Sequence, residues 1–212
     1  MDEILEQEQK ELAVVNTNQP VSIWEDKRAF NDAFTMAKTL ANAEIIPQAY
    51  RGKVSDCIVA IDLANQMGVS PITVMQNSQV VRGNFTWKGT ACKAMIDGCG
   101  KYRKSRYVEV GVRGTDSWGY YLEAVEKDGD IVKGTTVDIK MAKDEGWYNK
   151  DGSKWKTMPE LMLKYRAAAF FMRTECAGVA MGFLTAEEEE DIAPAPVKTG
   201  LTALLDGEVV ED

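Results

Sequence analysis

The chain has 212 residues, 45% of them hydrophobic and 27% charged, which is ordinary for a globular protein with one core. It contains no histidine, which excludes Ser-His and Cys-His nucleophile pairs, histidine-bound zinc and acid–base catalysis by imidazole. Four cysteines without a Cys-x-x-Cys pair favour free, mostly buried thiols over a zinc knuckle or a disulfide framework. No Gly-x-x-x-x-Gly-Lys-Ser/Thr motif occurs, so a P-loop ATPase is not supported.

The formal net charge of −8 is distributed unevenly along the chain. Residues 1–24 carry five acids and one base, and residues 185–212 carry nine acids and one base. The segment between them carries 23 bases and 19 acids. A basic body between acidic ends indicates an anionic ligand for the body.

The sequence predicts an acidic leader at 1–21, a single core at 22–191 and an acidic flexible tail at 192–212. The leader is polar and has no sustained period, so we expect it to be disordered or loosely helical. Its start is acidic where a secretion signal would be basic and then apolar, and no run of about 18 apolar residues follows. We therefore expect a cytoplasmic protein with no membrane partner.

Two helices are predicted at the start of the core. The first has a capping box, Ser22-Ile-Trp-Glu25, at its amino end and runs to about Ala43. Its apolar face consists of residues that recur at helical spacing: Phe30, Phe34, Ala37 and Ala41. The second helix begins at Ser55 and ends at Gly68. Its inward positions are Cys57, Ile58, Ile61 and Ala64.

The stretch from Ser70 to Lys93 contains three start or turn signals. Ser70 and Pro71 begin a helix, because the hydroxyl can cap free amides and proline lacks only an N–H that is unpaired there anyway. Gly83-Asn84 lies between two short apolar runs and suits a two-residue hairpin turn. Gly89-Thr90 then starts another helix. These elements would place amide, aromatic and cationic groups close together.

From residue 102 the hydrophobic period changes from that of a helix to that of a strand. Strands are predicted at 107–112, 118–125 and 131–137, with a hairpin signal at Asp128-Gly129. We expect an antiparallel meander that continues the earlier hairpin into one sheet. A short helix at 139–145 and the longest helix, from Met158 to about Cys176, follow. The predicted fold class is therefore α+β, with a hairpin and meander sheet packed against several helices.

Three groups of residues combine cations with aromatic rings. The first is Trp87, Lys88, Lys93, Lys101, Tyr102, Arg103, Lys104 and Arg106. The second is Trp147, Tyr148, Lys150, Lys154, Trp155 and Lys156. The third is the long helix, where Arg166 and Arg173 share a face at about 100° per residue. Single-stranded nucleic acid is bound by such groups, because cations follow the phosphates and rings stack on bases.

Each group also has a plainer explanation. Trp87, Trp147 and Trp155 fit core packing better than they fit base platforms. Gln76 and Asn77 can donate to phosphates or base edges, but a polar pair at the end of a short helix also fits a cap.

Short motifs follow one another through the chain in a defined order. They are Gly68-Val-Ser-Pro-Ile-Thr-Val-Met-Gln76-Asn77, Val80-Val-Arg-Gly83, Trp87-Lys-Gly89, Trp155-Lys156-Thr-Met-Pro159-Glu, Leu163-Lys-Tyr-Arg166-Ala-Ala-Ala-Phe-Phe-Met-Arg173 and Gly182-Phe-Leu-Thr-Ala-Glu-Glu. This series resembles the RecT family of phage single-strand DNA annealing proteins. The resemblance spans about Phe30 to Asp191 and leaves out the acidic ends.

The resemblance implies a protein that is not an enzyme and needs no ATP or other cofactor. Such a protein coats single-stranded DNA, pairs it with a complementary strand during recombination, and assembles into rings or helical filaments. It would act in the cytoplasm of a bacterial host cell if a phage or prophage encodes it. Family members often bind partners through a separate carboxy-terminal module, and a phage exonuclease or a host single-strand binding protein are the partners implied. Here that region is only a short acidic tail.

The resemblance also implies positions for the DNA contacts, in a groove flanked by the sheet and the long helix. Gln76 and Asn77 would lie near the DNA, and Lys88 and Lys93 would line the groove. Arg166 and Arg173 would contact phosphates, so we expect their alanine variants to bind oligonucleotides weakly and to fold normally. The complete set of expected DNA-binding residues is Gln76, Asn77, Lys88, Lys93, Lys101, Arg103, Lys104, Lys154, Lys156, Arg166 and Arg173.

Two alternatives remain open from the sequence. A metal-dependent nuclease would need converging carboxylates, for which the choices are Asp56, Asp62, Asp97 and Glu123. A protein-interaction module would instead present the basic patches to an acidic partner.

Overall fold

The computed structural model describes residues 22–192, and the chain divides into two compact units. The first unit ends at Val80 and the second begins at Val81. The chain therefore passes from one unit to the other once, whereas the sequence predicted a single core over 22–191. The leader at 1–21 and the tail from 193 lie outside the described residues.

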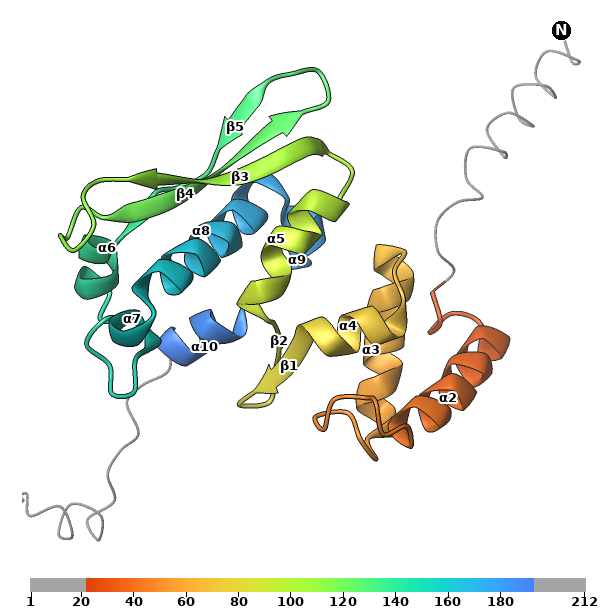
Figure 1. The fold of residues 1–212 in the computed structure, drawn as a ribbon. Helices are drawn as coiled ribbons and strands as arrows, with labels where there is room; N and C mark the ends of the chain where they lie inside the picture. The colour runs from red at the N-terminus through yellow and green to blue at the C-terminus, as the bar shows by residue number, and fades with distance from the viewer. Residues whose placement is uncertain (1–21, 193–212) are drawn as a thin grey trace, which may run out of the picture. The chain divides into compact units, whose positions relative to one another are not determined.

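Between residues 22 and 80 the first unit contains three helices, α2 (Lys27–Ala41), α3 (Val54–Met67) and α4 (Pro71–Asn77) (Figure 1). The predicted end of α3 is confirmed, because Gly68 adopts a left-handed conformation with φ 66°. The predicted start of α4 is also confirmed, with Ser70 at the cap and proline in the first turn. Among residues 22–192 no helix is by itself long and apolar enough to cross a membrane; only α3 and α4 reach that length and composition together, and they are bent by 111°.

Helix α2 differs from its prediction in its cap and in its buried face. Asp26, not a residue at 22–25, caps it by accepting a hydrogen bond from the Arg28 amide (2.7 Å). The buried residues of α2 are alanines only: Ala33, Ala37 and Ala41. Phe34 remains 36% exposed. Small side chains let two helices approach closely, so alanines, and not the larger rings, occupy the buried face of α2.

Strands β1 (Ser78–Val81) and β2 (Asn84–Trp87) form a two-stranded sheet of their own. The turn between them is Arg82-Gly83, one residue earlier than predicted, and both residues have positive φ (52° and 87°). A turn of type I′ requires positive φ at both central positions, which explains the register. The expectation that this hairpin continues into the meander is wrong, because the meander forms a separate sheet.

The second unit contains a four-stranded antiparallel sheet with β4 (Gly119–Glu126) at its centre. Its other strands are β3 (Tyr102–Val110), β5 (Ile131–Lys133) and β6 (Val137–Asp138). Strand β3 pairs with one side of β4, and β5 and β6 pair with the other. The predicted hairpin at Asp128-Gly129 is confirmed between β4 and β5. Strand β3 begins five residues earlier than the pattern predicted.

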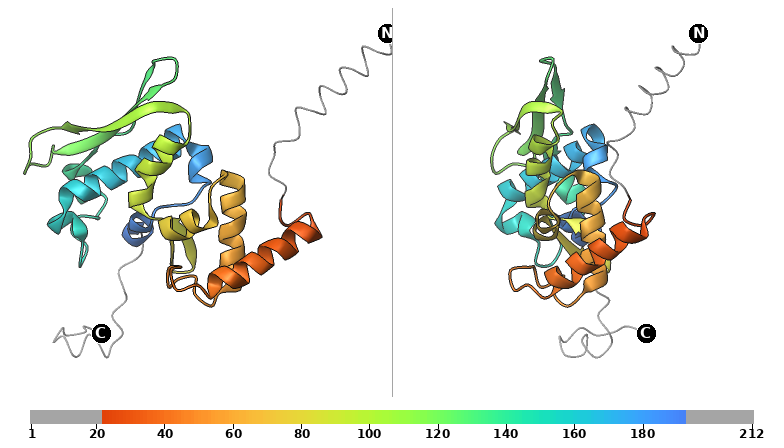
Figure 2. Two further views of the ribbon diagram at one scale, coloured as in Figure 1. Left: turned by 45° about the vertical axis from the view of Figure 1, so that its right-hand side comes forward. Right: turned by 90° about the vertical axis from the view of Figure 1, so that its right-hand side faces the viewer.

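Six helices complete the described part of the second unit, residues 81–192. They are α5 (Gly89–Gly98), α6 (Ile139–Asp144), α7 (Lys154–Thr157), α8 (Pro159–Glu175), α9 (Ala177–Ala180) and α10 (Ala186–Ile192). Helices α5 and α8 lie on the same face of the sheet, as the views in Figures 1 and 2 agree, and no helix among residues 81–192 covers the other face. The mixed fold with an antiparallel sheet and a long helix at 159–175 is therefore confirmed.

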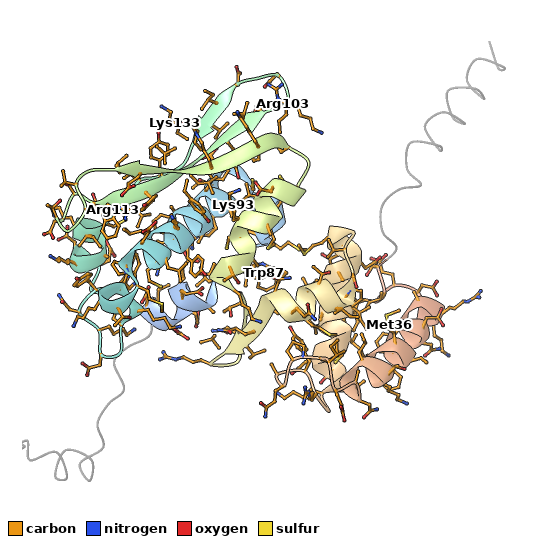
Figure 3. All side chains as sticks on the ribbon, in the orientation of Figure 1. Met36, Trp87, Lys93, Arg103, Arg113 and Lys133 are labelled. Carbon is orange, nitrogen blue, oxygen red and sulfur yellow. The ribbon has the colours of Figure 1, made fainter. Side chains whose placement is uncertain are left out.

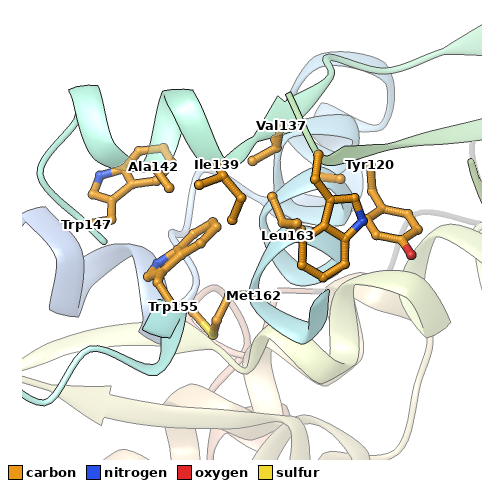
Figure 4. Close-up of a cluster of buried hydrophobic side chains, with 10 residues drawn as sticks. Tyr120, Val137, Ile139, Ala142, Trp147, Trp155, Met162 and Leu163 are labelled. Atoms are coloured by element: carbon orange, nitrogen blue, oxygen red, sulfur yellow. The ribbon is translucent and has the colours of Figure 1, made fainter. Parts of the chain in front are cut away.

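The core of the second unit lies between β4, β6 and helices α6 to α8 (Figure 4). Trp147 and Trp155 pack against each other, with ring centroids 5.6 Å apart. Trp118, Tyr120, Val137, Ile139, Ala142, Met162, Leu163 and Ala167 complete the cluster. Trp87, in β2, is also only 1% exposed. These tryptophans fill the interior, as the plainer interpretation predicted.

The four cysteines are free, and their environments predict different reactivities. Burial, with Glu188 and Glu187 nearby, raises the pKa of Cys92 to about 12. Burial also raises the pKa of Cys57 and of Cys176. Cys99 alone is partly exposed. Since the thiolate is the reactive form, we expect iodoacetamide at pH 8 to modify Cys99 first in the folded protein.

Peptide mass spectrometry checks this expectation. All four cysteines should react in urea, which is the control for reagent access. Modification of Cys92 as fast as Cys99 without denaturant would show that Cys92 is not held in the interior.

Candidate nucleic-acid interface

Arg166 in α8 is buried, with 4% of its side chain exposed. Its guanidinium forms an ion pair with Asp191 and lies 3.8 Å from Glu188. It also stacks over Trp147, 4.0 Å from the ring centroid. The expected phosphate contact from Arg166 is therefore not available in this structure, because carboxylates of α10 already occupy the guanidinium.

Arg173, two turns further along α8, shares one of these carboxylates. It forms an ion pair with Glu188, and 33% of its side chain remains exposed. Glu188 also accepts hydrogen bonds from the amide (2.9 Å) and hydroxyl (3.1 Å) of Thr185. The Thr185 hydroxyl accepts in turn from the Glu188 amide (3.3 Å), which completes a capping box at the start of α10. Glu188 thus caps the start of α10 and also neutralises the charge of Arg173 on α8.

Other carboxylates of α10 contact further parts of the second unit. Glu187 accepts a hydrogen bond from the Gly89 amide at the start of α5 (2.9 Å), and Glu189 accepts one from Asn84 (2.8 Å). Residues 187–190 and Asp191 therefore belong to a docked helix.

Burial shifts the pKa values of Arg166 and Asp191 toward their neutral forms, and the opposite charges beside them counteract this shift. Burial lowers the pKa of the Arg166 guanidinium, and the carboxylates of Glu188 and Asp191 oppose this change. Burial likewise raises the pKa of Asp191, and Arg166 opposes it. An arginine keeps its proton in proteins, so the buried cation needs both acids. The network is accordingly a structural clamp between α8 and α10.

The uncovered face of the sheet carries a different set of charges. Successive residues of a strand point to opposite faces, so Lys104 and Arg106 of β3 lie on the face opposite to Ser105 and Tyr107. Arg106 pairs with Glu123 of β4, which pairs in turn with Lys133 of β5. A row of three charged residues therefore crosses the sheet, and Lys104 lies beside it on β3. Figure 3 shows Lys133 on the side of the sheet away from α8.

Within this row one carboxylate is already neutralised. Arg106 donates two hydrogen bonds to Glu123 Oε1 (2.7 and 3.0 Å), and Glu123 is only 7% exposed. The Arg106 side chain nevertheless remains 71% exposed. Lys104 and Lys133 are exposed and form no ion pair with another residue of 22–192. The open face of the sheet, defined by Lys104, Arg106, Tyr121, Glu123 and Lys133, thus carries net positive charge.

The remaining cations of the first predicted group are distributed over several surfaces. Lys93 forms an ion pair with Asp97 within α5 (2.5 Å). Lys101 pairs with Glu126 (3.3 Å), and Arg103 donates to the Glu126 carbonyl (3.2 Å). Lys88 occupies the position before α5 and is partly buried. Of the predicted residues in this group, Lys104 therefore lies on the open face, and Arg103 lies at the edge of that face (Figure 3). Lys88 and Lys93 belong to α5 and its start, and so are not part of the open face.

Part of the second predicted group, Lys150, Lys154 and Trp155, lines a pocket of about 200 Å³ beside α7 and α10. Lys154 and Arg82 line it together with Glu187, Glu190 and Asp191. Lys156 is exposed on the same short helix. Because acids and bases mix in its lining, this pocket offers no clear preference for an anion.

Gln76 and Asn77 end helix α4 in the first unit. The Asn77 side chain donates to the Thr73 carbonyl one turn earlier (2.8 Å), as a residue at a helix end often does. Gln76 is exposed.

Sequence reasoning missed two members of the open face, Tyr121 and Lys133. The alternating pattern of strand residues contained the signal, because Lys133 follows Ile131 on the same face. It could not be used without the register that places Lys133 opposite Glu123.

The carboxylates considered for a nuclease do not converge. Glu123 is held by Arg106, and Asp97 by Lys93 and the Ser105 hydroxyl. In the part of the chain that the structure describes, no group of three or more Cys, Asp or Glu side chains is placed to hold a metal ion.

Comparison with known proteins gives no relative for this chain. No family model, no curated protein and no solved structure matches it.

Proposed function

We propose that this protein binds single-stranded DNA and anneals complementary strands without ATP, as proteins of the RecT type do. The observation that carries the proposal is the open face of the sheet, where Lys104, Arg106 and Lys133 are exposed around a single neutralised acid. An antiparallel sheet with helices on one face leaves its other face to a ligand. A flexible, negatively charged strand can follow cations arranged on adjacent strands.

Annealing requires that the protein holds the backbone and leaves the base edges free. Lysine and arginine side chains serve this purpose, because they contact phosphates and do not read sequence. Binding should therefore tolerate any sequence and weaken strongly with salt. Assembly of several copies along one strand, and delivery to an exonuclease or a host single-strand binding protein, belong to the same proposal.

The alternative of a protein-interaction module uses the same cations for an acidic protein. The open face favours DNA for a physical reason: its charges lie around Tyr121, a partly exposed ring on the central strand. Phosphates and bases together match a surface of cations and a ring. An acidic peptide matches only the cations.

An annealing assay tests the proposal. Two complementary 40-nucleotide strands, one with a fluorophore and one with a quencher, are mixed with protein in the presence of EDTA and without ATP. We expect the protein to accelerate annealing well above the spontaneous rate. No acceleration, together with no binding of either strand at low salt, would overturn the proposal. Shortening of the strands after magnesium is added would favour a nuclease.

A further inference from the structure

Three aromatic rings form a row on the first unit, of which two are exposed and the middle one is half-buried. The rings of Trp24 and Phe30 have centroids 5.8 Å apart, and those of Phe30 and Phe34 have centroids 6.4 Å apart with an angle of 11° between their planes. Trp24 is 58% exposed and Phe34 is 36% exposed. We call Trp24, Phe30 and Phe34 the aromatic row. Phe30 and Phe34 belong to the predicted apolar face of α2 but are not among its buried residues, and Trp24 precedes the helix.

The aromatic row is held in place by its own contacts. The Trp24 indole N–H donates to Asp62 of α3 (2.9 Å), and Asp62 also accepts from Gln66 (2.9 Å). Phe30 and Phe34 are separated by one turn of α2. A surface that is already ordered loses little entropy when a ligand binds, so these rings are suited to stacking.

Cations accompany the aromatic row on the same side of the helix. At about 100° per residue, Lys27, Phe34 and Lys38 fall on one face of α2, whereas Asp32 falls on the opposite face. The Lys38 ammonium lies 4.3 Å from the centroid of the Phe34 ring. Rings flanked by lysines match the alternation of bases and phosphates in a single strand.

We propose that the aromatic row is a stacking site for the bases of single-stranded DNA. The inference rests on the proposed function and adds a source of selectivity to it. Stacking uses the faces of bases and leaves their hydrogen-bonding edges free for a complementary strand. In a duplex the faces are already stacked on one another, so the row selects single strands and releases them when pairing is complete.

The chain contains a built-in reporter for this site. Of its five tryptophans, only Trp24 is exposed; the others are between 1% and 9% exposed, namely Trp87, Trp118, Trp147 and Trp155. A base that stacks on Trp24 should quench its fluorescence. We therefore expect a 20-nucleotide oligo-dT to lower the emission of the full-length protein, and Trp24→Leu to remove this change.

Binding measurements on variants test the site directly. Phe34→Ala and Trp24→Leu should each weaken oligo-dT binding by about 5- to 100-fold, the effect of losing one stacked base. Val59→Ala on α3, which removes an apolar side chain that is 46% exposed, is the matched control and should change nothing. Both row positions are exposed, so thermal unfolding should be nearly unchanged. An abasic oligomer and a 20-base-pair duplex should not quench Trp24 and should bind wild type and variants equally.

Each other outcome has a defined meaning. If the row variants bind oligo-dT like wild type while charge reversal on the sheet abolishes binding, the inference is wrong and the proposed function stands. If the variants lose affinity equally for oligo-dT and the abasic oligomer, the row does not stack bases, and the inference is again wrong. If wild type binds no oligonucleotide at low salt, both the inference and the proposed function are wrong.

Discussion

Replacing Arg166 with alanine is expected to lower the free energy of unfolding by about 3–5 kcal/mol, the typical cost of removing one partner of a buried ion pair. The variant would leave Glu188, which is 1% exposed, with Arg173 as its remaining arginine partner, and Asp191 without its ion pair. It would also remove the cation that stacks over Trp147. Because a domain is typically stable by only about 5–15 kcal/mol, this loss should be plain in urea unfolding followed by circular dichroism.

Lys164→Ala provides a control on the same helix. Lys164 pairs with Glu160 (2.6 Å), and both side chains are at least 30% exposed. A surface pair of this kind contributes about 0–1 kcal/mol, so the control should unfold close to wild type. Equal midpoints for Arg166→Ala and Lys164→Ala would show that the α8–α10 clamp contributes little. This expectation reverses the one drawn from the sequence, in which the alanine variant folds normally.

The second large effect is expected from reversing charge on the open face of the sheet. The double variant Lys104→Glu/Lys133→Glu should bind an oligo-dT strand about 100-fold or more weakly at moderate salt, because it removes phosphate contacts and adds repulsion. Both side chains are exposed and form no ion pair within residues 22–192, so the fold should tolerate the change. Fluorescence anisotropy of a labelled strand measures the effect.

A variant with the same change in net charge is needed beside it. Lys140→Glu/Lys143→Glu alters two exposed lysines of α6, which pair with Asp144 and Asp116 (both 2.5 Å). If binding depends only on total charge, the two double variants will weaken it alike, and the open face then has no special role. If the open face is the binding surface, the α6 variant should retain most of the affinity.

Local signals in the sequence predicted much of the second unit. A proline at the start of α8 and the glycine of Asp128-Gly129 determine local backbone geometry, whatever packs around them. The buried tryptophans were also anticipated. The proline and glycine signals depend on neighbouring residues only, which is why one sequence is enough to find them.

The DNA contacts expected from the long helix could not be judged in the same way. Helical spacing places Arg166 and Arg173 on one face but does not say what covers that face. The cover is α10, whose Asp191 is 25 residues beyond Arg166 in the chain. A Thr185-x-x-Glu188 capping box is typical of a helix start, but it does not indicate where that helix docks.

The faces of α2 show the same limit. Alanines and phenylalanines recur together at helical spacing, and the sequence alone treats both as apolar. The structure separates them, because α2 buries Ala33, Ala37 and Ala41 and leaves Phe34 partly exposed. Only the packing partner decides which part of an apolar stripe becomes core.

The role of the open face is tested most directly by the salt dependence of oligo-dT binding. The measurement compares wild type with the neutral variant Lys104→Ala/Lys133→Ala. If both lysines contact phosphates, the logarithm of the binding constant should fall linearly with the logarithm of salt concentration, with a slope shallower in the variant by about 0.7 for each lysine. Parallel lines for the two proteins, or no binding by wild type at the lowest salt, would contradict the assignment of this face to the DNA backbone.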